Sequence, residues 1–202
     1  MFIKVIMAIG LLGVTPIQAT EFRGSVSLQL VDTMEHPQHV RLVHPLSFID
    51  STGETWTTQA NRVIPLNLLT DELRLTRPLP NPFEYLKTII LYNGQAENAL
   101  TNWRDMQAIV YEALIEEGLQ EHWAKMIYAA VRAEGWRWEP VESSCFRSCH
   151  ANSPYLRWRP LPDYAQLLDT IDWILIDFPS LPEINDRVDS LIIKTGPHIF
   201  GQ

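Results

Sequence analysis

The two cysteines of the chain, Cys145 and Cys149, stand close together, and His150 follows the second. In an exported chain such a pair predicts a structural disulfide that closes a small loop. Two alternatives stay open. A haem c attachment site uses two cysteines and a histidine, with one residue fewer between the cysteines, and a thiol–disulfide redox pair also has that shorter spacing. The main prediction is a disulfide and no cofactor.

Three histidines, His36, His39 and His44, lie near one another and could converge on a metal ion, because neutral imidazole is a good zinc ligand. No carboxylate or cysteine stands at a familiar metal-ligand spacing beside them. We therefore expect surface histidines, with a metal site as the alternative.

Familiar catalytic motifs are missing from the sequence, which has no nucleophile elbow, zinc-protease motif or phosphate-binding glycine loop. Asp105 and His122 remain as candidates for acid–base catalysis. Adjacent carboxylates such as Glu116 and Glu117 are expected on solvated helix surfaces.

Seven tryptophans are many for 202 residues, and three of them alternate with arginines late in the chain. Alternation in two short strands, 135–139 and 155–159, predicts that these three indoles share one face. If exposed, that face would be a stacking platform for a sugar ring or a peptide; if buried, it would pack the strand pair onto helices. The ligand-binding candidates are Trp136, Trp138, Trp158 and Arg157.

Two amphipathic helices are the clearest predicted elements. Apolar residues recur at three- and four-residue steps over 103–114 and 123–131, and Thr101 is the predicted N-cap of the first helix. Because Gly118 leaves a short joint, the pair should form an antiparallel hairpin. Further helices are predicted over 82–93, with Asn81 as N-cap and ending at Gly94, over 163–177, with Asp163 as N-cap, and over 182–193.

The first third of the chain is rich in strand patterns. Strands are predicted over 25–32, over 40–49 with an interruption at Pro45, and over 54–58 after a turn at 50–53. Together they predict one small antiparallel sheet.

The predicted class is α+β: a small antiparallel sheet packed on the helical hairpin, with additional C-terminal helices. We expect an α+β domain over 20–138. The segment 139–202 is expected as a C-terminal extension that contains the disulfide-closed loop and two helices.

Residues 1–19 have the three parts of a cleavable secretory signal. Lys4 gives a positive start, about ten apolar residues run from Val5 to Val14, and Ala19 is a small residue for cleavage. This apolar run is too short to span a membrane, which needs ~20 residues. The mature chain is thus expected in the periplasm or outside the cell, with no membrane span.

The formal net charge of −8 limits the class of partner. An acidic chain is repelled by nucleic acid and by anionic membrane surfaces. A protein or a cell-wall component is therefore the expected partner.

Several segments between residues 40 and 138 occur in a distinctive order: a strand pair around Gly53, a segment ending in Ile64-Pro65, and an apolar helix at 88–91. Two further helices follow, the second with Met126-Ile127-Tyr128-Ala129-Ala130-Val131-Arg132. In this order the chain resembles a family of small bacterial and phage proteins catalogued as a domain of unknown function (number thirteen fifty-three). The resemblance covers about half the chain and implies a shared scaffold.

The polar motifs of that family differ in this chain. The family typically has T-D-G-A-S-I-P where the chain has Gln59-Ala60-Asn61-Arg62-Val63-Ile64-Pro65, and a His-Asp pair where the chain has Tyr92-Asn93. An acidic residue of the family falls on Gln107, with Asp105 nearby. The resemblance therefore implies a binding protein built on an enzyme-like scaffold.

Two functions remain open. The first is an exported protein that binds a protein or a cell-wall component without turnover, such as an inhibitor or immunity protein. The alternative is a divergent hydrolase of cell-wall or lipid substrates that uses Asp105, His122 or the early histidines.

Overall fold

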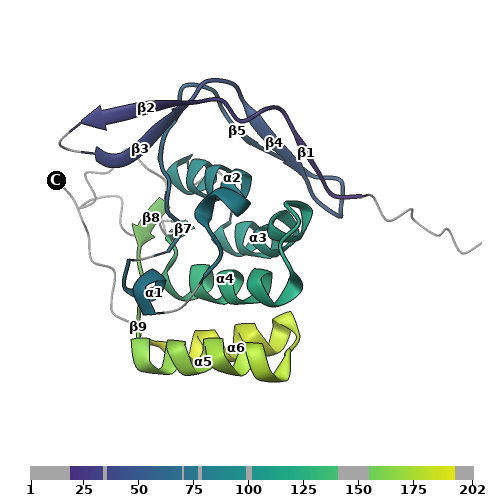
Figure 1. The fold of residues 1–202 in the computed structure, drawn as a ribbon, viewed down its shortest axis with the longest axis vertical. Helices are drawn as coiled ribbons and strands as arrows, with labels where there is room; N and C mark the ends of the chain where they lie inside the picture. The colour runs from purple at the N-terminus through teal and green to yellow at the C-terminus, as the bar shows by residue number, and fades with distance from the viewer. Residues whose placement is uncertain are drawn as a thin grey trace, which may run out of the picture.

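A computed structural model describes residues 19–33, 36–69, 71–76, 79–98, 102–140 and 155–193. Figure 1 shows three layers: small antiparallel sheets, then the helices α2, α3 and α4, then the helices α5 and α6. The predicted α+β class is confirmed. No helix among these residues is long and apolar enough to cross a bilayer.

The sheet layer contains two three-stranded antiparallel sheets. The first has the order β1 (Glu21–Arg23), β4 (Leu46–Ile49), β5 (Thr55–Thr58), and the second has the order β2 (Leu28–Thr33), β3 (His36–Leu42), β6 (Val63–Pro65). The prediction of one sheet is wrong, because the segment 40–49 leaves the second sheet after Leu42 and enters the first at Leu46. Pro45, which has no N–H to donate to a ladder, stands at this crossing. The predicted pairing of 46–49 with 55–58 is confirmed.

The helix α2 (Leu86–Asn98) lies between the sheets and the helical hairpin. It follows a short 3-10 turn, Pro82–Tyr85, whose predicted N-cap Asn81 is confirmed: its side chain accepts a hydrogen bond from Phe83 N at 3.1 Å. The prediction that Gly94 ends the helix is wrong. A Cβ on Gly94 would overlap the side chain of Thr58 in β5, so the glycine permits a close approach of helix and sheet.

The predicted hairpin of α3 (Trp103–Glu116) and α4 (Glu121–Glu134) is confirmed, with Gly118 in the joint at a φ of 88°. The N-cap of α3 is Asn102 instead of the predicted Thr101, since the Asn102 side chain accepts a hydrogen bond from Arg104 N at 3.0 Å. A short helix, α1 (Asp71–Thr76), was not predicted.

The C-terminal segment contributes a strand pair and the third layer. The pair is β7 (Arg137–Pro140) with β8 (Tyr155–Trp158), and the layer is α5 (Tyr164–Asp177) with α6 (Leu181–Leu191). Two short strands, β9 (Leu161–Pro162) and β10 (Ile192–Ile193), pair at the edge of this layer. Apolar residues of α5 and α6 belong to the same buried cluster as those of α3 and α4, so the two helices are part of the main core.

Candidate functional site

The register of β7 and β8 separates the predicted tryptophan candidates. Arg137 stands directly opposite Trp158, and Trp138 stands opposite Arg157. Because directly opposite residues share a face, Trp158 lies on the face of Arg137, and Trp138 lies on the other face. Trp138 is fully buried in the core. The prediction that the three indoles share one face is therefore wrong.

The other tryptophan of the prediction, Trp136, precedes β7 and is partly exposed, with the guanidinium of Arg159 over its ring at 5.2 Å. Sequence alternation defines the faces within one strand. The pairing of two strands across the segment 141–154 sets which faces coincide, and alternation contains no information about it.

Asp105 and His122 are not brought together. Asp105 lies in the first turn of α3 and His122 in the first turn of α4, and the two helices run antiparallel. Their first turns are thus at opposite ends of the hairpin, about 15 Å apart along its axis. The His122 ring contacts Trp123 and Phe178, with centroid distances of 4.7 and 6.3 Å.

The three early histidines do not form a metal site with other described residues. His36 and His39 lie in β3, and His44 is exposed in the segment that leads to β4. Within the described ranges, no group of three His, Cys, Asp or Glu residues is placed to hold a metal ion. Cys145, Cys149 and His150 lie outside the described residues, so the disulfide stays a prediction.

The polar positions that the family resemblance indicates do meet in space. Gln107 Nε2 donates a hydrogen bond to Tyr92 Oη at 3.3 Å, and Tyr92 Oη donates to the backbone oxygen of Trp136 at 3.0 Å. Asn93 Nδ2 donates to the backbone oxygens of Pro65 and Asn67, at 2.9 and 3.1 Å. Burial raises the pKa of Tyr92, so its phenol stays neutral. The Gln107 amide and the phenol bind one another, the phenol and the Asn93 amide bind backbone oxygens, and none of the three is an acid or base near neutral pH.

Glu117 is a half-buried carboxylate that sequence reasoning placed on a solvated surface. One carboxylate oxygen accepts a hydrogen bond from Lys87 N at 2.8 Å; the other accepts from Thr88 N and Thr88 Oγ1 at 2.8 and 2.7 Å. Burial raises the pKa of Glu117, although these hydrogen bonds oppose the shift. A perturbed carboxyl group is a candidate catalyst. Both oxygens, however, cap the N-terminus of α2, so the geometry assigns Glu117 a role in joining α3 to α2.

Arginine side chains surround the buried indole of Trp103. The guanidinium carbons of Arg137, Arg104 and Arg132 lie 4.4, 4.9 and 5.8 Å from the centre of its ring. Arg137 also lies 5.3 Å from the ring of Trp158. We call Trp103, Arg104, Arg132, Arg137 and Trp158 the Arg–Trp cluster. Cation–π contact of this kind stabilises a buried or half-buried guanidinium group.

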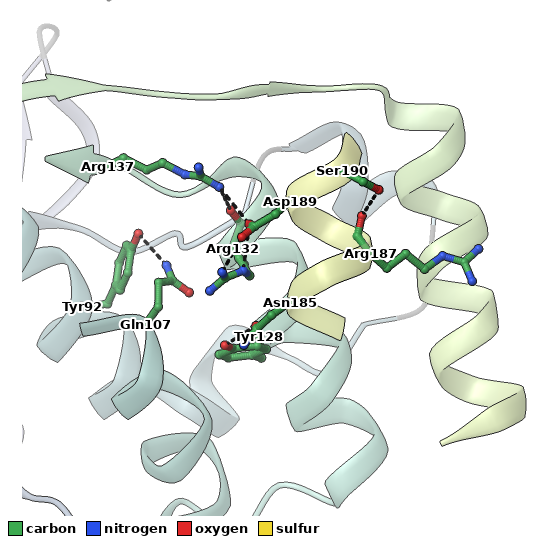
Figure 2. A network of polar contacts seen from close by, with 9 residues as sticks. All are labelled: Tyr92, Gln107, Tyr128, Arg132, Arg137, Asn185, Arg187, Asp189 and Ser190. Carbon is green, nitrogen blue, oxygen red and sulfur yellow. Dashed lines mark hydrogen bonds and ion pairs between the residues drawn. The ribbon is translucent and has the colours of Figure 1, made fainter. Parts of the chain in front are cut away.

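Polar contacts connect the Arg–Trp cluster to α6 (Figure 2). Arg132 forms a bidentate ion pair with Asp189, whose Oδ1 atom lies 3.7 Å from Arg137 Nη2. Three buried atoms, Trp103 Nε1, Arg137 Nε and Gln107 Oε1, make no hydrogen bond within the described part of the chain. An unpaired buried polar group destabilises a fold by about 1–3 kcal/mol, so these three atoms lower the stability of the folded chain.

Sequence reasoning identified Trp158 as a candidate but missed the helical members of the cluster. Trp103, Arg104 and Arg132 come from the adjoining ends of two antiparallel helices. The Trp-Arg pair at 103–104 was a usable signal, because an indole followed by a guanidinium also marks 136–137 and 158–159.

The α5–α6 layer carries a second unusual surface. Between residues 163 and 193 the chain has seven acidic residues and one basic residue. At the C-terminal end of α5, Ile176 and Phe178 are 77 % and 51 % exposed, and Leu175 is also exposed. We call Leu175, Ile176 and Phe178 the α5 apolar end. An exposed apolar group beside charged residues is typical of a protein-binding surface.

Comparison with known proteins shows a similarity to a protein of uncharacterized function. The chain is 24% identical over 114 residues to the uncharacterized protein y4iH of Sinorhizobium fredii (strain NBRC 101917 / NGR234). The match covers 55% of this chain and 47% of that protein, so it spans about half the length of the relative. No protein-family model matches the chain. No solved structure matches it either.

Proposed function

We propose that the chain is an exported protein that binds another protein without turnover, and that the partner docks on the α5–α6 layer. This layer lies on the side of the molecule away from the sheets (Figure 1). The observation that carries the proposal is the α5 apolar end, which exposes three large apolar side chains within a strongly acidic segment.

The surface itself indicates the chemistry of the partner. Asp177 is exposed within the α5 apolar end, and Asp169, Glu183 and Asp186 are exposed on the same two helices. Interfaces commonly combine apolar anchors with a charged rim, and opposite charges accelerate association. The partner is therefore a protein with a basic surface around an apolar pocket, as expected for the target of an acidic inhibitor or immunity protein.

Phe178 supports a binding role because its backbone is strained for a phenylalanine. It is the C-cap of α5 and has the left-handed φ and ψ angles of 49° and 51°, a conformation that glycine adopts most easily. A non-glycine residue in this conformation costs roughly 1–2 kcal/mol. The chain keeps a half-exposed aromatic ring where folding alone favours glycine, which is consistent with an anchor for a partner.

The arrangement of ionisable groups favours binding over hydrolysis. Asp105 and His122 lie at opposite ends of the hairpin, and the half-buried Glu117 caps a helix. The resemblance to the unknown-function family fits a scaffold whose polar positions at Tyr92, Asn93 and Gln107 now hold neutral side chains. Export rests on residues 1–19, and the intact mass of the protein isolated from the periplasm tests it, since cleavage after Ala19 removes these residues.

Photo-crosslinking in the organism that encodes the chain tests the docking surface. A benzophenone amino acid replaces Ile176 in one strain and Leu30, an exposed residue on the sheet layer, in a control strain. We expect one defined protein adduct at position 176 that is missing at position 30. Adducts to cell-wall glycan, equal adducts at both positions or no adduct at position 176 would contradict the proposed protein partner.

The variant Phe178→Gly separates binding from folding. Glycine relieves the left-handed backbone, so the free energy of unfolding should stay equal or rise, while the crosslink from position 176 should weaken. An unchanged crosslink would contradict the anchoring role of Phe178. An equally strong adduct in an Asp169→Lys, Asp186→Lys variant would contradict the basic character of the partner.

A further inference from the structure

The Arg–Trp cluster concentrates positive charge in a chain whose net charge is −8. Three guanidinium groups lie within 6 Å of the ring centre of Trp103. The carboxylate of Asp189 pairs with Arg132 and is only 47% exposed as a side chain, so it offsets part of this charge. Arg104 is exposed, and its guanidinium lies over the Trp103 ring.

Two buried donors of the cluster have no acceptor in the described part of the chain. Trp103 and Arg137 are 2% and 8% exposed, and neither Trp103 Nε1 nor Arg137 Nε makes a hydrogen bond there. The chain itself shows how a buried indole N–H is normally satisfied: Trp56 Nε1 donates to the carboxylate of Asp50 at 2.9 Å. Unpaired N–H donors beside positive charge favour an oxygen acceptor that is itself negative.

We propose that the Arg–Trp cluster is a binding site for a small oxyanion, the carboxylate or phosphate group of a ligand. Trp103 Nε1 and Arg137 Nε donate hydrogen bonds to the oxyanion, and Arg104 supplies charge at the exposed rim. The ligand enters on the side of Arg104 and the half-buried Trp158. Gln107 Oε1, the third unpaired buried atom, accepts a hydrogen bond from a hydroxyl or amide of the same ligand.

This site is separate from the proposed docking surface. Residues of α3, α4, β7 and β8 form the site, whereas the α5 apolar end belongs to the last turn and the C-cap of α5. Asp189 of α6 connects the two regions, because it forms an ion pair with Arg132 of the site. An incoming oxyanion therefore competes with the Asp189 carboxylate for the guanidinium groups.

Proton–nitrogen NMR of the full chain tests the proposal with sodium phosphate and sodium glucuronate as probes, at constant ionic strength. The indole N–H signal of Trp103, assigned by its loss in Trp103→Phe, should shift along a saturating curve. The indole signal of Trp56, which is already bonded to Asp50, is the internal control and should stay in place. Saturation by one probe alone identifies that group as the recognised chemistry.

Two variants complete the test. Arg104→Gln should weaken binding of the preferred probe about tenfold, because it removes one charge-assisted contact at an exposed position. Asp189→Asn should strengthen it, because a competing carboxylate is lost. Arg23→Gln, at an exposed ion pair on the sheet layer, is the matched control and should bind like the original chain. A Trp103 signal that moves no more than that of Trp56, or that moves linearly with both probes, would overturn the proposal, as would unchanged binding in Arg104→Gln.

Discussion

Arg132 and Asp189 form a bidentate ion pair in which Nε donates to Oδ1 at 3.0 Å and Nη2 donates to Oδ2 at 2.7 Å. The pair joins the end of α4 to the end of α6 (Figure 2). Ile184 and Val188 of α6 belong to the main buried cluster. Apolar burial thus holds the α5–α6 layer, and the charged contacts of Asp189 orient it.

The two side chains of this pair differ in exposure, and this difference predicts that removing one or the other lowers the free energy of unfolding by unequal amounts. The Arg132 side chain is 10% exposed, whereas that of Asp189 is 47% exposed. Asp189→Asn leaves a buried guanidinium group without its carboxylate and should lower the free energy of unfolding by about 2 kcal/mol. Arg132→Met keeps the apolar stem, leaves a hydrated carboxylate, and should cost about 1 kcal/mol. Urea denaturation measures the free energy of unfolding of both variants, and equal or reversed losses would contradict this explanation. The control is Arg23→Met, at an exposed ion pair, which should not change the free energy of unfolding measurably.

Gly94→Ala should destabilise the chain even though alanine is the better helix former by about 1 kcal/mol. The added Cβ overlaps the side chain of Thr58, so either α2 or β5 must move. We expect a net loss of about 1–3 kcal/mol in thermal or urea denaturation. In a Thr58→Ala background the same change should cost less or become favourable. A stabilising effect of Gly94→Ala alone would show that helix and sheet do not approach this closely.

Much of the fold follows from the local sequence. The stripes of α3 and α4 and the caps Asn81 and Asp163 are local signals, and all are confirmed. The prediction that Gly94 ends the helix was wrong because the role of Gly94 depends on Thr58, a residue distant in the sequence. Helix propensity describes what a residue prefers alone, and tertiary contact overrides it.

The candidate sites were harder to predict, for the same reason. The face shared by Trp158 and Arg137 depends on the pairing of two strands, and the position of Trp103 beside Arg132 depends on two helices running antiparallel. The Phe178 backbone has no local signal, since a phenylalanine in the left-handed conformation contradicts its own preference.

Asp50 should make stability depend on pH in the acid range. Its carboxylate accepts hydrogen bonds from Thr52 N, Thr52 Oγ1, Glu54 N and Trp56 Nε1. Burial acts to raise the pKa of Asp50, but these hydrogen bonds outweigh it and leave the pKa below its ordinary value of 3.8. A carboxyl group with a lowered folded-state pKa contributes stability above the unfolded value, and this contribution is lost as the pH falls through the folded value.

The variant Asp50→Asn checks this sign. At pH 7 it should lower the free energy of unfolding by about 2 kcal/mol, because an amide cannot accept all four hydrogen bonds. The difference from the original chain should shrink once the pH falls below 3.8. Urea denaturation at several pH values measures it, with the exposed Asp186→Asn as the control. A difference that stays constant or grows on acidification would contradict the lowered pKa.

Tyr92 and Gln107 should behave as a coupled pair. The Tyr92 hydroxyl accepts a hydrogen bond from Gln107 Nε2 and donates one to the Trp136 backbone oxygen, so Tyr92→Phe leaves two buried groups unpaired and should cost about 1–3 kcal/mol. Gln107→Leu removes an amide whose Oε1 atom is already unpaired, and should be neutral or stabilising. In the Gln107→Leu background, Tyr92→Phe should therefore cost about 0.5–1 kcal/mol less, because one of the two groups is no longer present to be left unpaired.

Tyr128→Phe is the matched control: its hydroxyl donates to Asn185 Oδ1 at 2.7 Å, and the half-buried Asn185 remains accessible to water. Strictly additive costs for Tyr92 and Gln107 in a urea-denaturation cycle would mean that the amide does not depend on the phenol, and that the polar contact between α2 and α3 contributes nothing to their packing.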